Sequence, residues 1–172
     1  MLVGFMGSGK STVGPLLASR LGWSFLDFDE EIERRARASV EDIFRTRGEP
    51  FFRALEAQVA GELLRLDRAV LATGGGWPAV AGRMEALGHD TLSVWLDVDA
   101  GTSVERVRRG GRVRPLLEVP DPVGRAKLLL SERATFYGRA GLRFDASNTS
   151  PAAIVERVLE HMDAVSRGES RT

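Results

Sequence analysis

Residues 4–12 read GFMGSGKST, and this glycine-rich loop constrains the fold more than any other part of the chain. The run from Gly4 to Ser11 fits G-x-x-x-x-G-K-S, a pattern that cradles phosphates when it follows a strand and opens a helix. Residues 1–5 predict a short buried strand, and residues 11–22 predict a helix that ends at its final glycine. The required context is therefore present, and the loop predicts a nucleoside triphosphate site.

Each residue type in this loop suits phosphate binding. Backbone N–H groups can point into one concavity, and a side chain there would block a close approach. The following helix adds positive potential at its N-terminus. We expect Lys10 to reach the β- and γ-phosphates and Ser11 to supply an oxygen ligand to Mg²⁺. The predicted triphosphate-binding residues are Gly7, Ser8, Gly9, Lys10, Ser11 and Thr12.

Length and composition narrow the class of protein. A chain of 172 residues suits one domain, and the absence of cysteine excludes disulfides and thiolate metal sites. A formal net charge of zero argues against a general nucleic-acid-binding surface. No apolar stretch reaches membrane-spanning length, and the N-terminus has no signal-peptide pattern, so we expect a cytoplasmic protein with no membrane partner. Of the 24 basic residues, only Lys10 and Lys127 are lysine.

Predicted strands and helices alternate along the chain with short connections. This order predicts an α/β fold, with a parallel sheet covered by helices on both faces. The predicted strands are residues 1–5, 23–29, 69–73, 91–98 and 142–146. The predicted helices are residues 11–22, 30–66 in pieces, 78–88, 100–109, 124–140 and 151–165.

Two carboxylates close the second predicted strand. Asp27 and Asp29 alternate along it, so only a twist at the strand end would let both serve one site. One carboxylate beside Mg²⁺ would help to place the metal, and the other could orient an acceptor hydroxyl or take its proton. The alternative is a solvated strand end with no function.

The third predicted strand runs directly into Gly74, Gly75 and Gly76. Open α/β sheets bind ligands at the carboxyl ends of their strands, and bare backbone there suits a close approach. The alternative is a flexible turn into the next element, for which one glycine would normally suffice.

Arginines on two predicted helices are candidates for an anion site. Arg53 and Arg133 lie far apart in the sequence, and the arginine fork grips carboxylates in bidentate fashion. The alternative is that both are surface residues, with Arg53 forming a simple helix ion pair to Glu56 three residues later.

Residues 108–124 form a candidate lid. Arg112 and Arg114 lie between glycines and prolines, and an arginine on a moving loop could close over a transferring phosphate. Arg108 and Arg109 precede them and could stack on a base. The alternative is a solvated basic loop.

Together these motifs resemble the shikimate kinase family. The matching stretches are GFMGSGKST at 4–12, DFD at 27–29, GEPFFRALE at 48–56, GGG at 74–76, RPLL at 114–117 and ERATFY at 132–137. The resemblance implies a three-layer P-loop kinase fold, like that of nucleoside monophosphate kinases, with a five-stranded parallel sheet in order 2-3-1-4-5 and a lid. It implies one domain over residues 1–172, with a shikimate-binding subregion at about 28–58.

The same resemblance implies the reaction and its catalytic residues. The γ-phosphoryl group of ATP would pass to the 3-hydroxyl of shikimate, in the pathway to chorismate and the aromatic amino acids. Lys10, Asp29 and Arg114 would be catalytic, and Ser11 with Asp27 would hold Mg²⁺. Family habit suggests a monomer.

The substrate contacts are likewise implied by the resemblance. Arg53 and Arg133 would bind the shikimate carboxylate, and residues 74–76 would line its pocket. Arg114 would come down with the lid onto the ATP phosphates, and Arg109 would stack on adenine.

Two of the chain's departures from the family pattern lie near the proposed binding sites. Trp77 follows the glycines where a small residue is expected, and it would either wall the pocket or pack away from it. The segment DASNTSP lacks an arginine often found near adenine, so Asn148 or Thr149 would have to take its place through backbone contacts.

Two other functions fit part of the pattern. Gluconate kinase, or another small-polyol kinase on the same fold, also acts on a hydroxylated carboxylate. A regulatory nucleotide sensor would use the triphosphate site alone, although it would have no need for the acceptor-binding residues.

Overall fold

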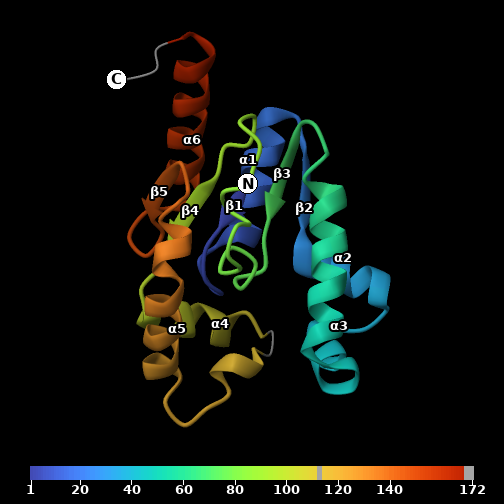
Figure 1. Cartoon of the computed structure of the whole chain (residues 1–172). Helices are drawn as coiled ribbons and strands as arrows, with labels where there is room; N and C mark the ends of the chain where they lie inside the picture. The colour runs from blue at the N-terminus through green and yellow to red at the C-terminus, as the bar shows by residue number, and fades with distance from the viewer. Residues whose placement is uncertain (112–113, 169–172) are drawn as a thin grey trace.

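The computed structural model describes residues 1–111 and 114–168, and its centre is a five-stranded sheet (Figure 1). All strand pairs are parallel, in the order β2-β3-β1-β4-β5, which confirms the expected fold class and strand order. The strands are β1 Leu2–Val3, β2 Ser24–Asp27, β3 Ala69–Ala72, β4 Val94–Asp97 and β5 Leu142–Asp145.

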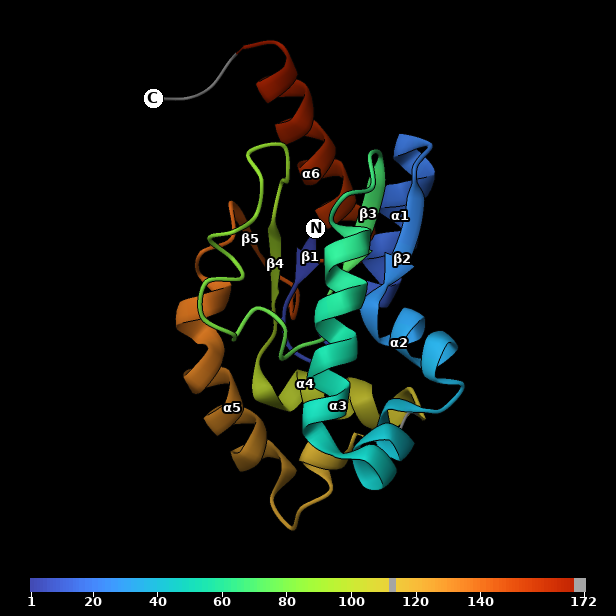
Figure 2. The same cartoon turned by 45° about the vertical axis from the view of Figure 1, so that its right-hand side comes forward.

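Helices connect the strands and extend beyond the sheet. They are α1 Lys10–Leu21, α2 Phe28–Ala36, α3 Val40–Leu63, α4 Ala100–Arg109, the 3-10 turn η1 Pro115–Leu117, α5 Pro122–Tyr137 and α6 Pro151–Ser166. Figure 2 shows α2 and the first half of α3 standing beside and below β2, at the carboxyl end of the strands. In the part of the chain that the structure describes, no helix is both long and apolar enough to cross a membrane.

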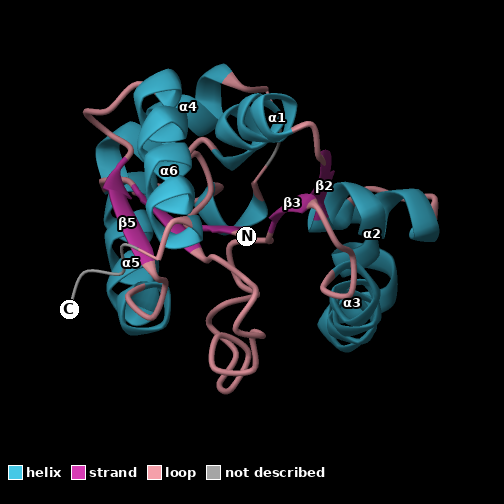
Figure 3. Cartoon of the chain, turned by 90° about the horizontal axis from the view of Figure 1, so that it is seen from above, coloured by secondary structure: helices cyan, strands magenta, loops and turns pink. Residues whose placement is uncertain are grey.

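The helices form one layer on each face of the sheet, as Figure 3 shows: α1 and α6 on one face, α3 and α5 on the other. Leu2 and Val3 of β1 point to opposite faces, as neighbours in a strand must, and each belongs to a different core cluster. Leu2 packs with α1 and α6, and Val3 with α3 and α5. The sheet is therefore buried on both sides, which explains its apolar strands.

The helix predicted over residues 78–88 is wrong. The segment consists of successive turns, and it lies between α3 and α5 on one face of the sheet (Figure 3). Its apolar spacing reflects isolated anchors, since Met84 is buried in the core while Gly82, Glu85 and Ala86 are exposed. Gly82 has φ +83°, a left-handed conformation that ends any right-handed helix there.

Helix α3 begins at a capping serine and bends at a glycine. The Ser39 hydroxyl accepts a hydrogen bond from the Asp42 N–H, which caps the helix. Gly48 has φ 78° and ψ 170°, so the helix restarts there with Pro50 in its new first turn. The bend sets the direction of the half of α3 that carries Arg53.

Candidate active site

The glycine-rich loop joins β1 to α1 at the carboxyl edge of the sheet. Gly9 is the N-cap of α1 with φ 96°, and no side chain caps the helix. A β-carbon at Gly9 would meet no atom within 4 Å. Ser103 of α4 anchors the loop from behind, because its hydroxyl donates to the Met6 carbonyl at 2.8 Å. The open amide end of α1 is therefore a ready site for an anion.

Lys10 folds back onto the loop that carries it. Its Nζ donates to the carbonyls of Gly4 at 2.7 Å and Phe5 at 2.9 Å, and to the Ser8 hydroxyl at 3.3 Å. Burial lowers the pKa of Lys10 to about 8, and the carboxylates of Asp27 and Asp29 oppose this shift. The ammonium thus stands between the loop and the two carboxylates.

ATP binding at pH 8.5 is expected to take up about half a proton or more, because phosphates favour the ammonium form of Lys10 and restore its pKa. With a pKa of about 8, Lys10 is mostly neutral at pH 8.5 and mostly charged at pH 7. Uptake should therefore nearly vanish at pH 7. Calorimetry in two buffers of different ionisation enthalpy measures it, and equal heats in both buffers at pH 8.5 would contradict the assignment.

Asp27 and Asp29 come together through a helix start rather than a twisted strand. Strand β2 ends at Asp27, which caps α2 by accepting the Asp29 N–H at 2.9 Å. Asp29 lies in the first turn of α2, whereas the sequence predicted it on the strand. Burial, and next the charge of Asp29, raise the pKa of Asp27, while Lys10 opposes the rise. A cation beside Asp27 would relieve this cost.

A hydroxyl and a carboxylate are available for a metal ion. Ser11 and Asp27 both line a cavity of about 360 Å³ at the mouth of the loop. Within residues 1–111 and 114–168, no three His, Cys, Asp or Glu residues gather into a metal cluster. Mg²⁺ usually takes one or two protein oxygens and completes its shell with water and phosphate. This pair of hard oxygen donors fits Mg²⁺.

The glycine run (residues 74–76) contacts three of the predicted acceptor residues in turn. A β-carbon at Gly74 would lie 2.7 Å from Asp29 Oδ1. One at Gly75 would lie 3.6 Å from Arg133 Nη1, and one at Gly76 would lie 3.4 Å from both terminal nitrogens of Arg53. The carboxylate of Asp29 and the guanidinium groups of Arg133 and Arg53 therefore all lie next to the backbone of the glycine run.

Substituting Gly74 with alanine is expected to lower kcat/KM for the acceptor by about tenfold or more, because the new methyl displaces the Asp29 carboxylate. The melting temperature should change little, since the clash is with the end of a side chain. Gly61→Ala is the matched control, because a β-carbon there meets nothing within 4 Å. Steady-state kinetics with unchanged kcat/KM for Gly74→Ala would contradict the prediction.

Helix α5 fixes the middle glycine from the other side. Tyr137 Oη donates to the Gly75 carbonyl at 2.6 Å, and Arg133 Nη1 donates to the same oxygen at 3.2 Å. Arg133 also lies over the Phe5 ring, with 5.7 Å between its Cζ and the ring centroid. Arg133 is half-buried and keeps further N–H groups for a ligand.

The lid reaches the site through Arg114. Arg114 Nη1 lies 3.6 Å from Asp29 Oδ2, and both side chains line the 360 Å³ cavity. Arg112, also predicted in the lid, lies outside the described residues. The cavity residues are Met6, Gly7, Gly9, Lys10, Ser11, Thr12, Asp27, Asp29, Thr73, Gly75, Arg106, Val107, Gly110 and Arg114.

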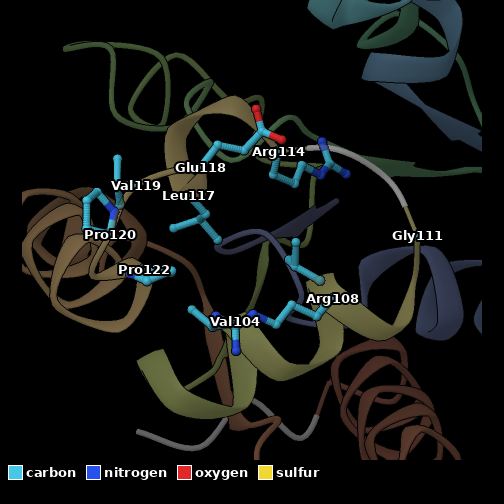
Figure 4. Close-up of a pocket in the computed structure, with 10 residues that line it drawn as sticks. Val104, Arg108, Gly111, Arg114, Leu117, Glu118, Val119, Pro120 and Pro122 are labelled. Atoms are coloured by element: carbon cyan, nitrogen blue, oxygen red, sulfur yellow. The ribbon is translucent and has the colours of Figure 1, made fainter.

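A second cavity has a volume of about 630 Å³. It lies between α4 and the segment around η1 (Figure 4). Val104 and Arg108 line it from α4, and Leu117 and Glu118 line it from the lid (Figure 4). Arg114 lines both cavities and therefore lies between them.

Arg106 of α4, which the sequence did not single out, faces the glycine-rich loop, while the stacking of Arg109 on adenine stays a prediction. Arg109 pairs with Glu105 at 2.7 Å, its side chain is 78% exposed, and it does not line the cavity. Arg106 does line it, and donates to the carbonyls of Ala146 at 2.9 Å and Gly7 at 3.5 Å. Its spacing of three from the buried Ser103 places both on one face of α4, a signal that the sequence contained.

Trp77 and Asn148, the residues at the two departures from the family pattern, lie in different surroundings. Trp77 packs into the core: it is 2% exposed and meets the Phe28 ring edge to face, with centroids 5.7 Å apart. Asn148 turns toward Asp145, to which its side-chain amide donates at 2.9 Å. Of the two alternatives for Trp77, packing away from the pocket and into the core is the one observed.

Comparisons with known proteins agree on one family. The family model described as shikimate kinase matches residues 6–163. A shikimate kinase from Synechococcus sp. (strain RCC307) is 44% identical over 161 residues, covering 94% of this chain and 82% of that protein. One from Symbiobacterium thermophilum is 41% identical over 171 residues, covering 98% and 97%. A solved shikimate kinase from Acinetobacter baumannii, in complex with shikimate, matches with a TM-score of 0.87 and 36% identity over 95% of this chain and 91% of that one.

Proposed function

The chain belongs to the shikimate kinase family and is thus an ATP-dependent kinase of shikimate, and we propose how its residues transfer the γ-phosphoryl group to the 3-hydroxyl. The observation that carries the proposal is the glycine run, which gathers Asp29, Arg53 and Arg133 beside the glycine-rich loop. An acceptor with an anion and several hydroxyls matches this set of groups. The products would be shikimate 3-phosphate and ADP.

Arg53 and Arg133 bind the carboxylate of shikimate in this proposal. Both guanidinium groups border the glycine run, and each retains N–H groups that can donate to a carboxylate. Anchoring the ring at its anionic end leaves the hydroxyls to face Asp29. The acceptor oxygen is thereby aimed at the mouth of the glycine-rich loop.

Phosphoryl transfer relies on positioning and on charge stabilisation. The loop amides, Lys10 and Arg114 stabilise the charge on the γ-phosphoryl oxygens while the 3-hydroxyl oxygen attacks phosphorus. The bond from that phosphorus to the bridging oxygen breaks, and ADP leaves with its electron pair. Asp29 orients the hydroxyl and accepts its proton.

Ser11 and Asp27 would hold Mg²⁺, and they fit it as a hydroxyl–carboxylate pair in the same cavity. The ion, when bound, would neutralise negative charge on the phosphates of ATP. Arg109 is proposed to stack on adenine, and Arg106 supports the nucleotide site by joining the loop to the Ala146 segment.

The enzyme is proposed to act as a cytoplasmic monomer. All of the site residues named above come from one chain, and the chain holds no cysteine for disulfides. Gel filtration with light scattering would test the monomer: a mass of twice 18.8 kDa would contradict it.

A spectrophotometric assay coupled to ADP release tests the function. It is run with a panel of hydroxy acids that includes shikimate and gluconate. Strong dependence on shikimate and on added Mg²⁺ is expected. Turnover that shikimate leaves unchanged would favour the nucleotide sensor, and preference for gluconate would favour the other kinase.

A further inference from the structure

Glu56 is a buried carboxylate shared between two arginines. It is 1% exposed, and its oxygens accept from Arg53 Nη1 at 3.1 and 3.3 Å and from Arg83 Nη1 at 2.8 Å. A buried charge is costly unless it is paired, so Glu56 requires at least one of these cations. The sequence indicated a simple helix pair with Arg53, and the structure adds a second and shorter contact.

Arg83 is held in place from several sides. Its guanidinium lies over the Trp77 ring, with 5.4 Å between Cζ and the ring centroid, and its Nη1 also lies 3.5 Å from the Trp77 carbonyl. Its side chain is 18% exposed, against 35% for Arg53. The tryptophan that replaces an expected small residue therefore serves as a platform for this arginine.

Arg53 and Arg83 both pair with Glu56, but only Arg53 borders the proposed acceptor site. Arg53 borders Gly76, where an acceptor carboxylate is proposed to bind, whereas Arg83 contacts Glu56 and Trp77. Arg53 also pairs with the exposed Glu49 at 3.1 Å, so without Arg83 it would face Glu49, the buried Glu56 and the incoming carboxylate. With Arg83 present, Glu56 has a second cation of its own, and Arg53 can share the incoming carboxylate with Arg133.

We propose that Arg83 is a positioning residue for the acceptor site, which carries the charge of Glu56 so that Arg53 remains available to the substrate carboxylate. The inference rests on the proposed function, in which that carboxylate belongs to shikimate. Arg83 acts through Glu56 and does not touch the acceptor, so its effect should fall on acceptor affinity rather than on the chemical step.

Arg83→Met is expected to raise the KM for shikimate by about tenfold, because a charge-assisted contact is weakened. The kcat and the KM for ATP should stay within about twofold of wild type, as expected for a loss of uniform acceptor binding. Arg83→Lys keeps the charge and should raise the KM less than Arg83→Met does. Arg143→Met is the matched control, since Arg143 likewise pairs with a carboxylate, Asp97 at 2.6 Å, and lies over an indole, Trp95 at 4.4 Å.

A double variant separates charge balance from packing. In Arg83→Met with Glu56→Gln, the buried charge is gone, so Arg53 no longer has to neutralise it, and the KM for shikimate should fall below that of Arg83→Met alone. A role in packing only would give additive or greater damage. Should Arg83→Met fail to fold, by its melting temperature, Arg83→Gln with and without Glu56→Gln provides the same comparison.

The outcomes distinguish this inference from the proposed function. A wild-type enzyme without shikimate-dependent ADP release would overturn the function itself. An active wild type whose Arg83 variants keep the KM for shikimate, or whose double variant shows no recovery, would overturn only the role of Arg83.

Discussion

Replacing Arg114 with alanine is expected to lower kcat by about a thousandfold and to leave the KM for shikimate nearly unchanged. Arg114 lines the cavity beside Lys10, and its guanidinium lies 3.6 Å from Asp29, so it can stabilise charge at the transferring phosphoryl group. The carboxylate of the acceptor is assigned to other arginines, and its binding should survive. Steady-state assays at saturating ATP measure both constants.

Arg157→Ala is a suitable control, because Arg157 stacks over Phe144 on the α6 side of the sheet. It removes an arginine and a ring contact without touching the cavity. If Arg114→Ala instead kept kcat and lost acceptor binding, Arg114 would belong to the shikimate pocket and its placement over the phosphates would be incorrect.

Substituting Asp29 with asparagine is expected to lower kcat by about a hundredfold or more, with a smaller change in the KM for shikimate. The amide keeps the size and part of the hydrogen bonding but accepts no proton, and it no longer neutralises Arg114. Asp97→Asn, which removes a carboxylate from an ion pair with Arg143, is the control. A variant that retained kcat with a raised KM would reduce Asp29 to a binding group.

Much of this fold can be predicted from short sequence patterns. The glycine-rich loop needs only a strand before it and a helix after it, and both are encoded within the first 22 residues. Ser39 and Gly48 mark the start and the bend of α3 by their own chemistry, as capping residue and left-handed glycine. The strand order came from the resemblance, and the sheet confirms it.

Other features depend on contacts that a sequence does not display. The segment 78–88 has helical spacing, yet its few buried side chains are anchors for a chain of turns between α3 and α5. The second partner of Glu56 could not be predicted, because Arg83 reaches it from that irregular segment. The position of Asp29 was available in principle, since the acidic run after Phe28 is typical of a first helical turn.

The burial of Lys10 in the glycine-rich loop makes its amine useful as a chemical probe. With a pKa of about 8, this amine is a stronger nucleophile near neutral pH than an ordinary lysine, and the chain has just one other lysine, Lys127, which is exposed on α5. An amine-selective acylating reagent would therefore label Lys10, Lys127 and the α-amine of Met1, whose pKa burial lowers to about 6, and a protease digest separates the three positions, with Lys127 as the internal reference. Bound nucleotide should protect Lys10 from acylation. The loss of label at Lys10, measured by mass spectrometry, would then report how much of the nucleotide site is occupied, without a substrate assay.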